Sequence, residues 1–96
     1  MASAAETARQ SIEITNQRGL HARASAKFVA AVSKLAPGTG VVVSKDGIEA
    51  SGSSILGLMM LGAAKGDTVE ISVSGEDATA ILTKLIGLVM DGFGED

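Results

Sequence analysis

The chain contains no cysteine, tryptophan or tyrosine, and it has only one proline and two phenylalanines. Without cysteine it forms neither a disulfide nor a thiolate zinc site, which fits a reducing compartment. Because aromatic residues are scarce, the core must be built from Val, Ile, Leu, Met and Ala. With 96 residues, of which 46% are hydrophobic and 20% charged, the chain is long enough for one folded domain but not for two.

Clustered positive charge and long apolar segments are also missing. The formal net charge is −3, whereas nucleic-acid binding requires clustered Lys and Arg and, for single strands, aromatic side chains. The longest apolar segment, residues 55–64, is about half of the ~20 residues that a membrane-spanning helix needs. The first eight residues lack the basic start and the apolar stretch of a signal peptide. We therefore expect a cytoplasmic protein that binds no nucleic acid and does not insert into a membrane.

The hydrophobic pattern predicts alternating strands and helices. Polar-apolar alternation, with a hairpin turn at Asp46-Gly47, predicts strands at residues 11–15, 41–45, 48–51 and 68–74. Helical spacing of apolar residues predicts helices at about residues 22–35, 54–61 and 78–90, the last preceded by a sequence that resembles a capping box at residues 74–77.

The order β-α-β-β-α-β-α predicts an α+β fold. Strands with polar outer faces indicate a mostly antiparallel four-stranded sheet that three helices cover on one side only. We expect residues 1–9 to be a flexible arm and residues 10–96 to be a single domain.

The only histidine, His21, lies in the run Gly-Leu-His-Ala-Arg at residues 19–23, where a loop passes into the first helix. A neutral imidazole is a nucleophile near neutral pH. The start of a helix offers unpaired backbone N–H groups, here those of Ala22, Arg23 and Ala24, and the positive end of the helix dipole, and both favour an anion. Arg23 adds a permanently charged fork that can bind phosphate oxygens in two places. The run predicts that His21 carries a phosphoryl group.

The same residues allow plainer interpretations. A single histidine near a helix start is most often a surface residue or a helix cap, and the Arg23 side chain could simply be solvated. No neighbouring carboxylate, second histidine or cysteine indicates a metal site or a catalytic triad. Gly19 permits the backbone conformation that would direct the His21 ring outward.

Ser54 and the apolar residues that follow it form a second motif. As a plain N-cap, Ser54 would contribute ~1 kcal/mol. The short helix after it has apolar residues on nearly every side, so we expect Leu58 and Leu61 in the core and other apolar side chains at the surface. The residues expected to form a docking surface for partner proteins are Leu20, Ile55, Leu56, Met59 and Met60.

Residues 19–23 and the motif at residues 54–62 and 64–67 resemble the HPr family of phosphocarrier proteins of the bacterial phosphoenolpyruvate-dependent phosphotransferase system. The similarity extends from about Ser11 to Met90. The resemblance implies an open-faced β-sandwich in which His21 accepts phosphate on Nδ1 from enzyme I and passes it to an enzyme II A-type component. It implies that Arg23 steadies the phosphoryl group. We expect no cofactor and no metal.

The resemblance also implies a regulatory role for Ser54, which matches the serine that HPr kinase/phosphorylase modifies in lineages that have this enzyme. A glycine and a serine precede Ser54 where the family often has a basic residue, so the chain departs from the family pattern next to the serine that the kinase would recognise. We expect a monomer that serves sugar transport or, as a slight preference, nitrogen-related regulation.

Three classes of function remain open. The first is a phosphoryl carrier, a transferase component rather than an enzyme that turns over a small molecule. The second is a regulatory binding module controlled at Ser54, with His21 incidental. The third, a small metabolite-binding domain, would need a concave polar pocket that the sequence does not predict.

Overall fold

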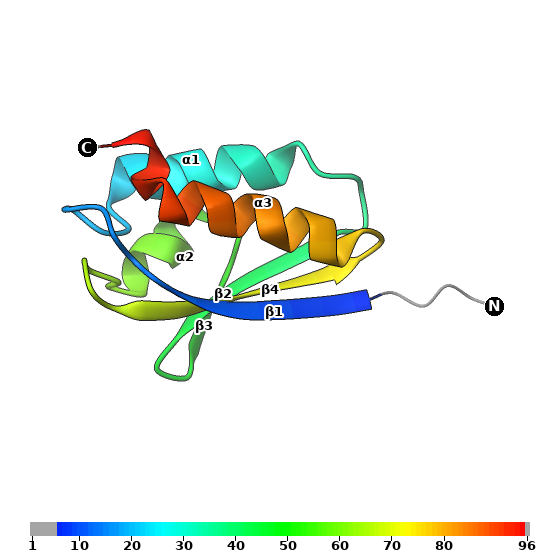
Figure 1. Ribbon diagram of the computed structural model, residues 1–96, viewed down its shortest axis with the longest axis horizontal. Coiled ribbons are helices and arrows are strands. Elements are labelled where there is room, and N and C mark those ends of the chain that lie inside the picture. The colour runs from blue at the N-terminus through cyan, green and yellow to red at the C-terminus, as the bar shows by residue number, and fades with distance from the viewer. Residues whose placement is uncertain (1–5, 96) are drawn as a thin grey trace.

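The computed structural model describes residues 6–95, in which helices lie on one face of a four-stranded sheet (Figure 1). The elements in chain order are β1 (Glu6–Glu13), α1 (Ala22–Ser33), β2 (Gly40–Lys45), β3 (Ile48–Ser51), α2 (Ile55–Met60), β4 (Thr68–Gly75), α3 (Ala78–Met90) and the 3-10 helix η1 (Gly92–Gly94). The predicted α+β class, element order and one-sided coverage of the sheet are confirmed.

The sheet is antiparallel throughout, in the order β1-β4-β2-β3. The hairpin between β2 and β3 turns at Asp46 and Gly47, whose φ angles are 53° and 83°. A two-residue hairpin loop with positive φ at both positions favours the right-handed twist of the flanking strands, so the Asp-Gly signal was interpreted correctly.

Strand β1 begins at Glu6, so the prediction of a flexible arm was wrong for residues 6–9. These residues pair with β4, from Glu6 opposite Gly75 to Arg9 opposite Ser72. Their side chains do not show a clear alternation because β1 is an edge strand, held mainly by backbone hydrogen bonds to its neighbour. Residues 1–5 of the expected arm lie outside the described part of the chain.

The core lies between the sheet and the helices. It consists of inward residues of the strands, among them Val43, Ile71 and Val73, and of the apolar faces of the helices. Both aromatic residues belong to it: Phe28 of α1 is 2% exposed and Phe93 of η1 is 1% exposed. Burial of Phe93 anchors the end of the chain against the rest of the domain.

The expected capping box before α3 was wrong. The N-cap residue is Asp77, which has the left-handed values φ 60° and ψ 26° and makes no side-chain capping hydrogen bond. Ser74, the first residue of the expected box, instead belongs to β4, where it pairs with Thr7 and Gly40 on the two neighbouring strands. Pairing in the sheet therefore outweighed the local signal for a cap.

Helix α3 runs along the domain toward the N-terminal end of α1, and the short segment after it packs against α1 there (Figure 1). Two parts of the chain that are far apart in sequence, the loop before α1 and residues 92–95, thus lie together. Among residues 6–95 no helix is long and apolar enough to cross a membrane.

Candidate functional site

The loop before α1 turns at Gly19, which has a φ of +62°. A Cβ atom at this position would lie 2.3 Å from the carbonyl oxygen of Ala63, so the loop and residue 63 pack too closely for any side chain. The Leu20 N–H donates to the same carbonyl over 2.9 Å. The chain therefore reaches His21 along a path that only glycine allows.

His21 is the N-cap residue of α1, with extended backbone angles. Its side-chain Nδ1 accepts a hydrogen bond from the backbone N–H of Arg23 at 3.2 Å. Ala22 and Ala24, the other expected phosphate-binding positions, flank Arg23 in the first turn, with Ala22 exposed and Ala24 buried. His21 thus caps the helix, and because Nδ1 accepts this bond, it has the lone pair that a nucleophile requires.

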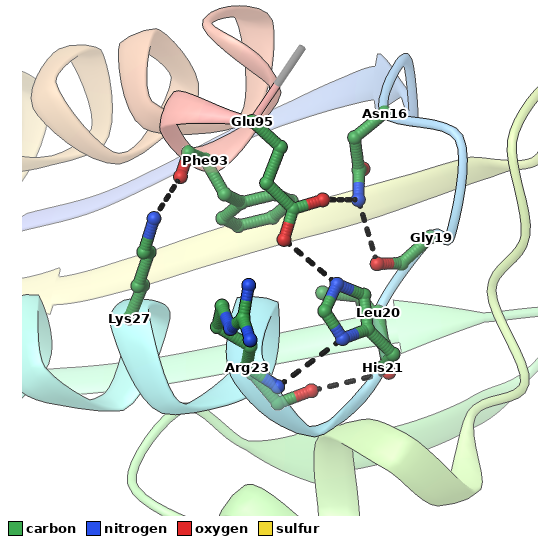
Figure 2. Close-up of polar contacts among 9 residues, drawn as sticks. Asn16, Gly19, Leu20, His21, Arg23, Lys27, Phe93 and Glu95 are labelled. Atoms are coloured by element: carbon green, nitrogen blue, oxygen red, sulfur yellow. Dashed lines mark hydrogen bonds and ion pairs between the residues drawn. The ribbon is translucent and has the colours of Figure 1, made fainter.

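The other ring nitrogen of His21 contacts Glu95, a residue that the sequence analysis did not single out (Figure 2). The distance from Nε2 to Oε2 is 2.7 Å, and the two side chains are only 15% and 17% exposed. This carboxylate comes from a distant part of the chain, 74 residues from His21, so the residues near the histidine did not indicate it. The expectation of an outward-directed ring was wrong, because the C-terminal segment covers it.

Asn16 holds the second carboxylate oxygen of Glu95. Its Nδ2 group donates to Oε1 of Glu95 at 3.0 Å and to the carbonyl oxygen of Gly19 at 2.9 Å. Asn16 is buried, and both partners are acceptors, so its amide has one favourable orientation. The same side chain thereby links the His21 loop to the C-terminal segment.

The environment lowers the pKa of the Glu95 carboxyl below its usual value of 4.5. The largest cause is the hydrogen bond from Asn16, since it favours the ionised form. Partial burial acts in the opposite direction, whereas the hydrogen bond and charge of His21 and the charge of Lys27 lower the pKa further. Glu95 is consequently a carboxylate at neutral pH.

A tight turn at the end of the chain places Glu95 over the ring. Phe93 has a φ of 59°, a left-handed conformation that is strained for an aromatic residue. Its buried side chain and a 2.7 Å hydrogen bond from Lys27 Nζ to its carbonyl oxygen hold this conformation (Figure 2). Lys27 belongs to α1, so the helix that His21 caps also fixes the position of Glu95.

Beside His21 lies an open hollow of about 340 Å³, lined by Gln17, Arg18, Arg23, Lys27, Gly94 and Glu95. Three of these residues are cationic and one is anionic. Arg18 and Arg23 form no ion pair within residues 6–95, and Figure 2 shows Arg23 next to the His21 ring. The hollow can therefore accept an anion next to the histidine.

Ser54 is the N-cap of α2, as predicted. Its Oγ accepts a hydrogen bond from the backbone N–H of Gly57 at 2.9 Å. The helix has six residues and packs against α1. Ser54 and His21 thus cap two neighbouring helices on the same side of the sheet (Figure 1).

The apolar residues of α2 divide as the sequence predicted. Leu58 and Leu61 are buried, and the exposed side chains are Ile55 at 41%, Leu56 at 67%, Met59 at 40% and Met60 at 74%. Leu20 was wrongly expected at this surface, because it is only 7% exposed and belongs to the core. After the turn at Gly19, the Leu20 side chain packs in the core.

Comparisons with known proteins agree with this geometry. Residues 8–91 match the family model described as the PTS HPr component phosphorylation site. The chain is 45% identical over 87 residues to phosphocarrier protein HPr of Neisseria meningitidis, a match that covers 91% of this chain and 96% of the relative. It is 36% identical to phosphocarrier protein NPr of Escherichia coli, covering 94% of this chain and 99% of the relative.

A solved structure of HPr from Thermoanaerobacter tengcongensis has the same fold. It superimposes with a TM-score of 0.85 at 37% sequence identity, over 93% of this chain and 98% of the other. The identity to the Neisseria HPr exceeds that to the Escherichia coli NPr, so the comparisons do not favour a nitrogen-related branch. Fold, family model and relatives agree: the chain belongs to the HPr family of phosphocarrier proteins of the phosphotransferase system.

Proposed function

We propose that His21 is the residue that carries the phosphoryl group, on Nδ1, from enzyme I to an enzyme II A-type component. The observation that carries this proposal is the hydrogen bond from the Arg23 N–H to Nδ1. An atom that accepts this bond is unprotonated and has a lone pair, which points into the first turn of a helix. That is the place where a phosphoryl group finds backbone donors.

The transfer follows from this placement. The Nδ1 lone pair attacks phosphorus of the donor phosphohistidine, the donor's P–N bond breaks, and its electron pair returns to the donor ring. The hydrogen bond between Arg23 N–H and Nδ1 is lost when the lone pair forms the new bond. The freed N–H then donates to a phosphoryl oxygen, and the helix dipole stabilises the added negative charge.

Arg23 and the cationic hollow stabilise the group while it is carried. The guanidinium of Arg23 can bind two phosphoryl oxygens, which a lysine ammonium cannot do in the same geometry. Its lack of an ion-pair partner within residues 6–95 leaves the fork available. At a partly open site these interactions orient the phosphoryl group without holding it too tightly for onward transfer.

The exposed apolar residues of α2 support the partner assignment. A surface of Ile55, Leu56, Met59 and Met60 next to the start of α1 gives protein partners an adaptable apolar contact beside the reactive histidine. On this proposal one surface serves enzyme I and the enzyme II component in turn, in the cytoplasm, and the carrier acts as a monomer.

Ser54 is proposed as a second, regulatory phosphorylation site. Its hydroxyl caps α2 immediately before the apolar surface, so a phosphate there would add a charge of about −1.5 to −2 beside the docking residues. Charge at a helix N-terminus is compatible with the fold, so the effect would be weaker docking rather than unfolding.

The test of the carrier role is incubation with phosphoenolpyruvate and enzyme I, followed by intact mass and acid treatment. We expect one acid-labile phosphoryl group that is absent from His21→Ala. A protein that gains no mass while enzyme I is active would contradict the proposal. Phosphate on Ser54 should instead be acid-stable, require a nucleotide-dependent kinase and remain in His21→Ala.

A further inference from the structure

Both ring nitrogens of His21 have defined partners, and together these partners select one form of the ring. Nδ1 faces a backbone N–H, which can only donate, so Nδ1 must accept. Nε2 faces the Glu95 carboxylate at 2.7 Å, which can only accept when ionised, so Nε2 must donate. The two contacts are compatible with a neutral ring only when its proton is on Nε2.

We infer that Glu95 is a positioning residue for His21: its carboxylate holds the proton on Nε2 and so keeps the Nδ1 lone pair free to accept the phosphoryl group. The inference rests on the proposed function of His21. In this role Glu95 bonds to the ring and not to the phosphoryl group. It acts through the ring that it orients, as buried carboxylates do behind catalytic histidines.

The carboxylate also balances a charge that appears during transfer. When Nδ1 forms its bond to phosphorus while Nε2 keeps its proton, the ring becomes an imidazolium with one positive charge. Glu95 is in hydrogen-bond contact with the atom that carries this proton. When the phosphoryl group leaves, the electron pair of the P–N bond returns to Nδ1 and the ring is neutral again. The proton stays on Nε2 throughout, so no further acid or base is needed.

The structure around Glu95 indicates that the contact is built rather than incidental. Asn16 holds the second carboxylate oxygen at 3.0 Å, which fixes the rotation of the carboxyl group. Phe93 anchors the segment in the core despite a left-handed backbone, and Lys27 fixes the Phe93 carbonyl. A strained conformation that neighbouring contacts hold in place is typical of functional sites.

The experiment uses the single histidine of the chain, which gives one imidazole spectrum without overlap. Samples labelled with 15N at histidine are compared for the full chain, Glu95→Ala, Glu95→Gln and the control Glu76→Ala. Glu76 lies in the exposed turn before α3, at the opposite end of that helix from the site, and its substitution changes the charge equally. The full chain and the control should show an Nε2–H proton that exchanges slowly with water.

In Glu95→Ala this Nε2–H signal should be lost to rapid exchange. The rate constant of phosphoryl transfer from enzyme I should fall about tenfold, the scale of one charge-assisted hydrogen bond. The KM of enzyme I for the carrier should not change, because the expected docking residues are untouched. Glu95→Gln, which keeps an acceptor but loses the charge, should have an intermediate rate.

The inference is overturned if both Glu95 variants transfer phosphate as fast as Glu76→Ala, or if the full chain shows no protected Nε2–H proton. Failure of the carrier role would look different, because the unsubstituted protein would then gain no phosphoryl group on His21. The Nε2–H measurement needs no phosphoryl donor and tests Glu95 in either case.

Discussion

Replacing Gly19 with alanine should destabilise the domain and displace His21 at the same time. The residue has a φ of +62°, and the new Cβ would lie 2.3 Å from the Ala63 carbonyl oxygen and 2.8 Å from the Ala64 Cα. Favourable contacts between carbon atoms occur at about 3.5–4.0 Å, so the loop must move away from residues 63 and 64.

The magnitude follows from two contributions. A left-handed backbone costs a residue with a side chain about 1–2 kcal/mol. Movement of the loop breaks the 2.9 Å hydrogen bond from Leu20 N–H to the Ala63 carbonyl, which contributes about 1 kcal/mol. The free energy of unfolding should therefore fall by at least about 2–3 kcal/mol, before any loss from repacking Leu20.

Gly62→Ala is the matched control. Gly62 has a φ of +66°, but no atom lies within 4 Å of a Cβ placed there, so this variant tests the backbone contribution alone. Urea unfolding of both variants should show the larger loss for Gly19→Ala, and phosphorylation by enzyme I should slow only in that variant. If Gly19→Ala were no less stable than Gly62→Ala, close packing of the loop against residue 63 would not be what places His21.

Three further predictions concern the site and its surroundings. Arg23→Lys should slow phosphoryl transfer, measured with enzyme I, while the free energy of unfolding changes by no more than about 0.5 kcal/mol. Ser54→Ala removes the cap on Gly57 N–H and should lower the free energy of unfolding by about 1 kcal/mol in urea titrations. The Glu95 carboxyl should titrate below 4.5 by 13C NMR, and at higher pH in Asn16→Ala, which lacks the main hydrogen bond. The pKa of Glu95 is lower in the folded than in the unfolded state, so its ionised form stabilises the fold. This contribution should be complete above pH 4.5 and should be lost as the pH falls through the folded-state pKa. The difference in Tm between the unsubstituted protein and Glu95→Gln should therefore shrink as the pH is lowered.

Features that depend on a few neighbouring residues could be predicted from the sequence. The Asp46-Gly47 hairpin, the glycine before His21 and the cap at Ser54 all follow from local backbone chemistry, and each is present. Strand residues 6–9 could not be predicted in this way, because pairing with β4 stabilises them and their own pattern does not. The prediction that Leu20 lies at the docking surface was wrong for a related reason. A turn that only glycine allows directs the Leu20 side chain into the core.

The contact between Glu95 and His21 could not be predicted from neighbouring residues. Glu95 is 74 residues from His21 along the chain, and nothing near the histidine indicates a carboxylate. A signal was nevertheless present: Phe93 is one of only two aromatic residues and stands between two glycines. A large apolar side chain between two glycines is typical of a residue that packs into the core. If Phe93 packs there, the residues next to it, including Glu95, must lie on the surface of the domain.

If His21 carries the phosphoryl group as proposed, the two roles of its Nδ1 lone pair would let one small domain be charged and discharged with little structural change. The Nδ1 lone pair caps α1 in the free protein, and the same lone pair would bind phosphorus in the charged one. Charging would therefore exchange one acceptor for another at the Arg23 amide. A phosphoryl oxygen would replace the ring nitrogen, and the helix start would keep a partner in both states. On the proposed mechanism the Nε2 contact to Glu95, 2.7 Å in the free protein, would be kept during transfer. Since neither exchange requires α1 or the C-terminal segment to move, a partner protein would meet nearly the same apolar surface on α2 in both states, and the phosphoryl group itself would distinguish them.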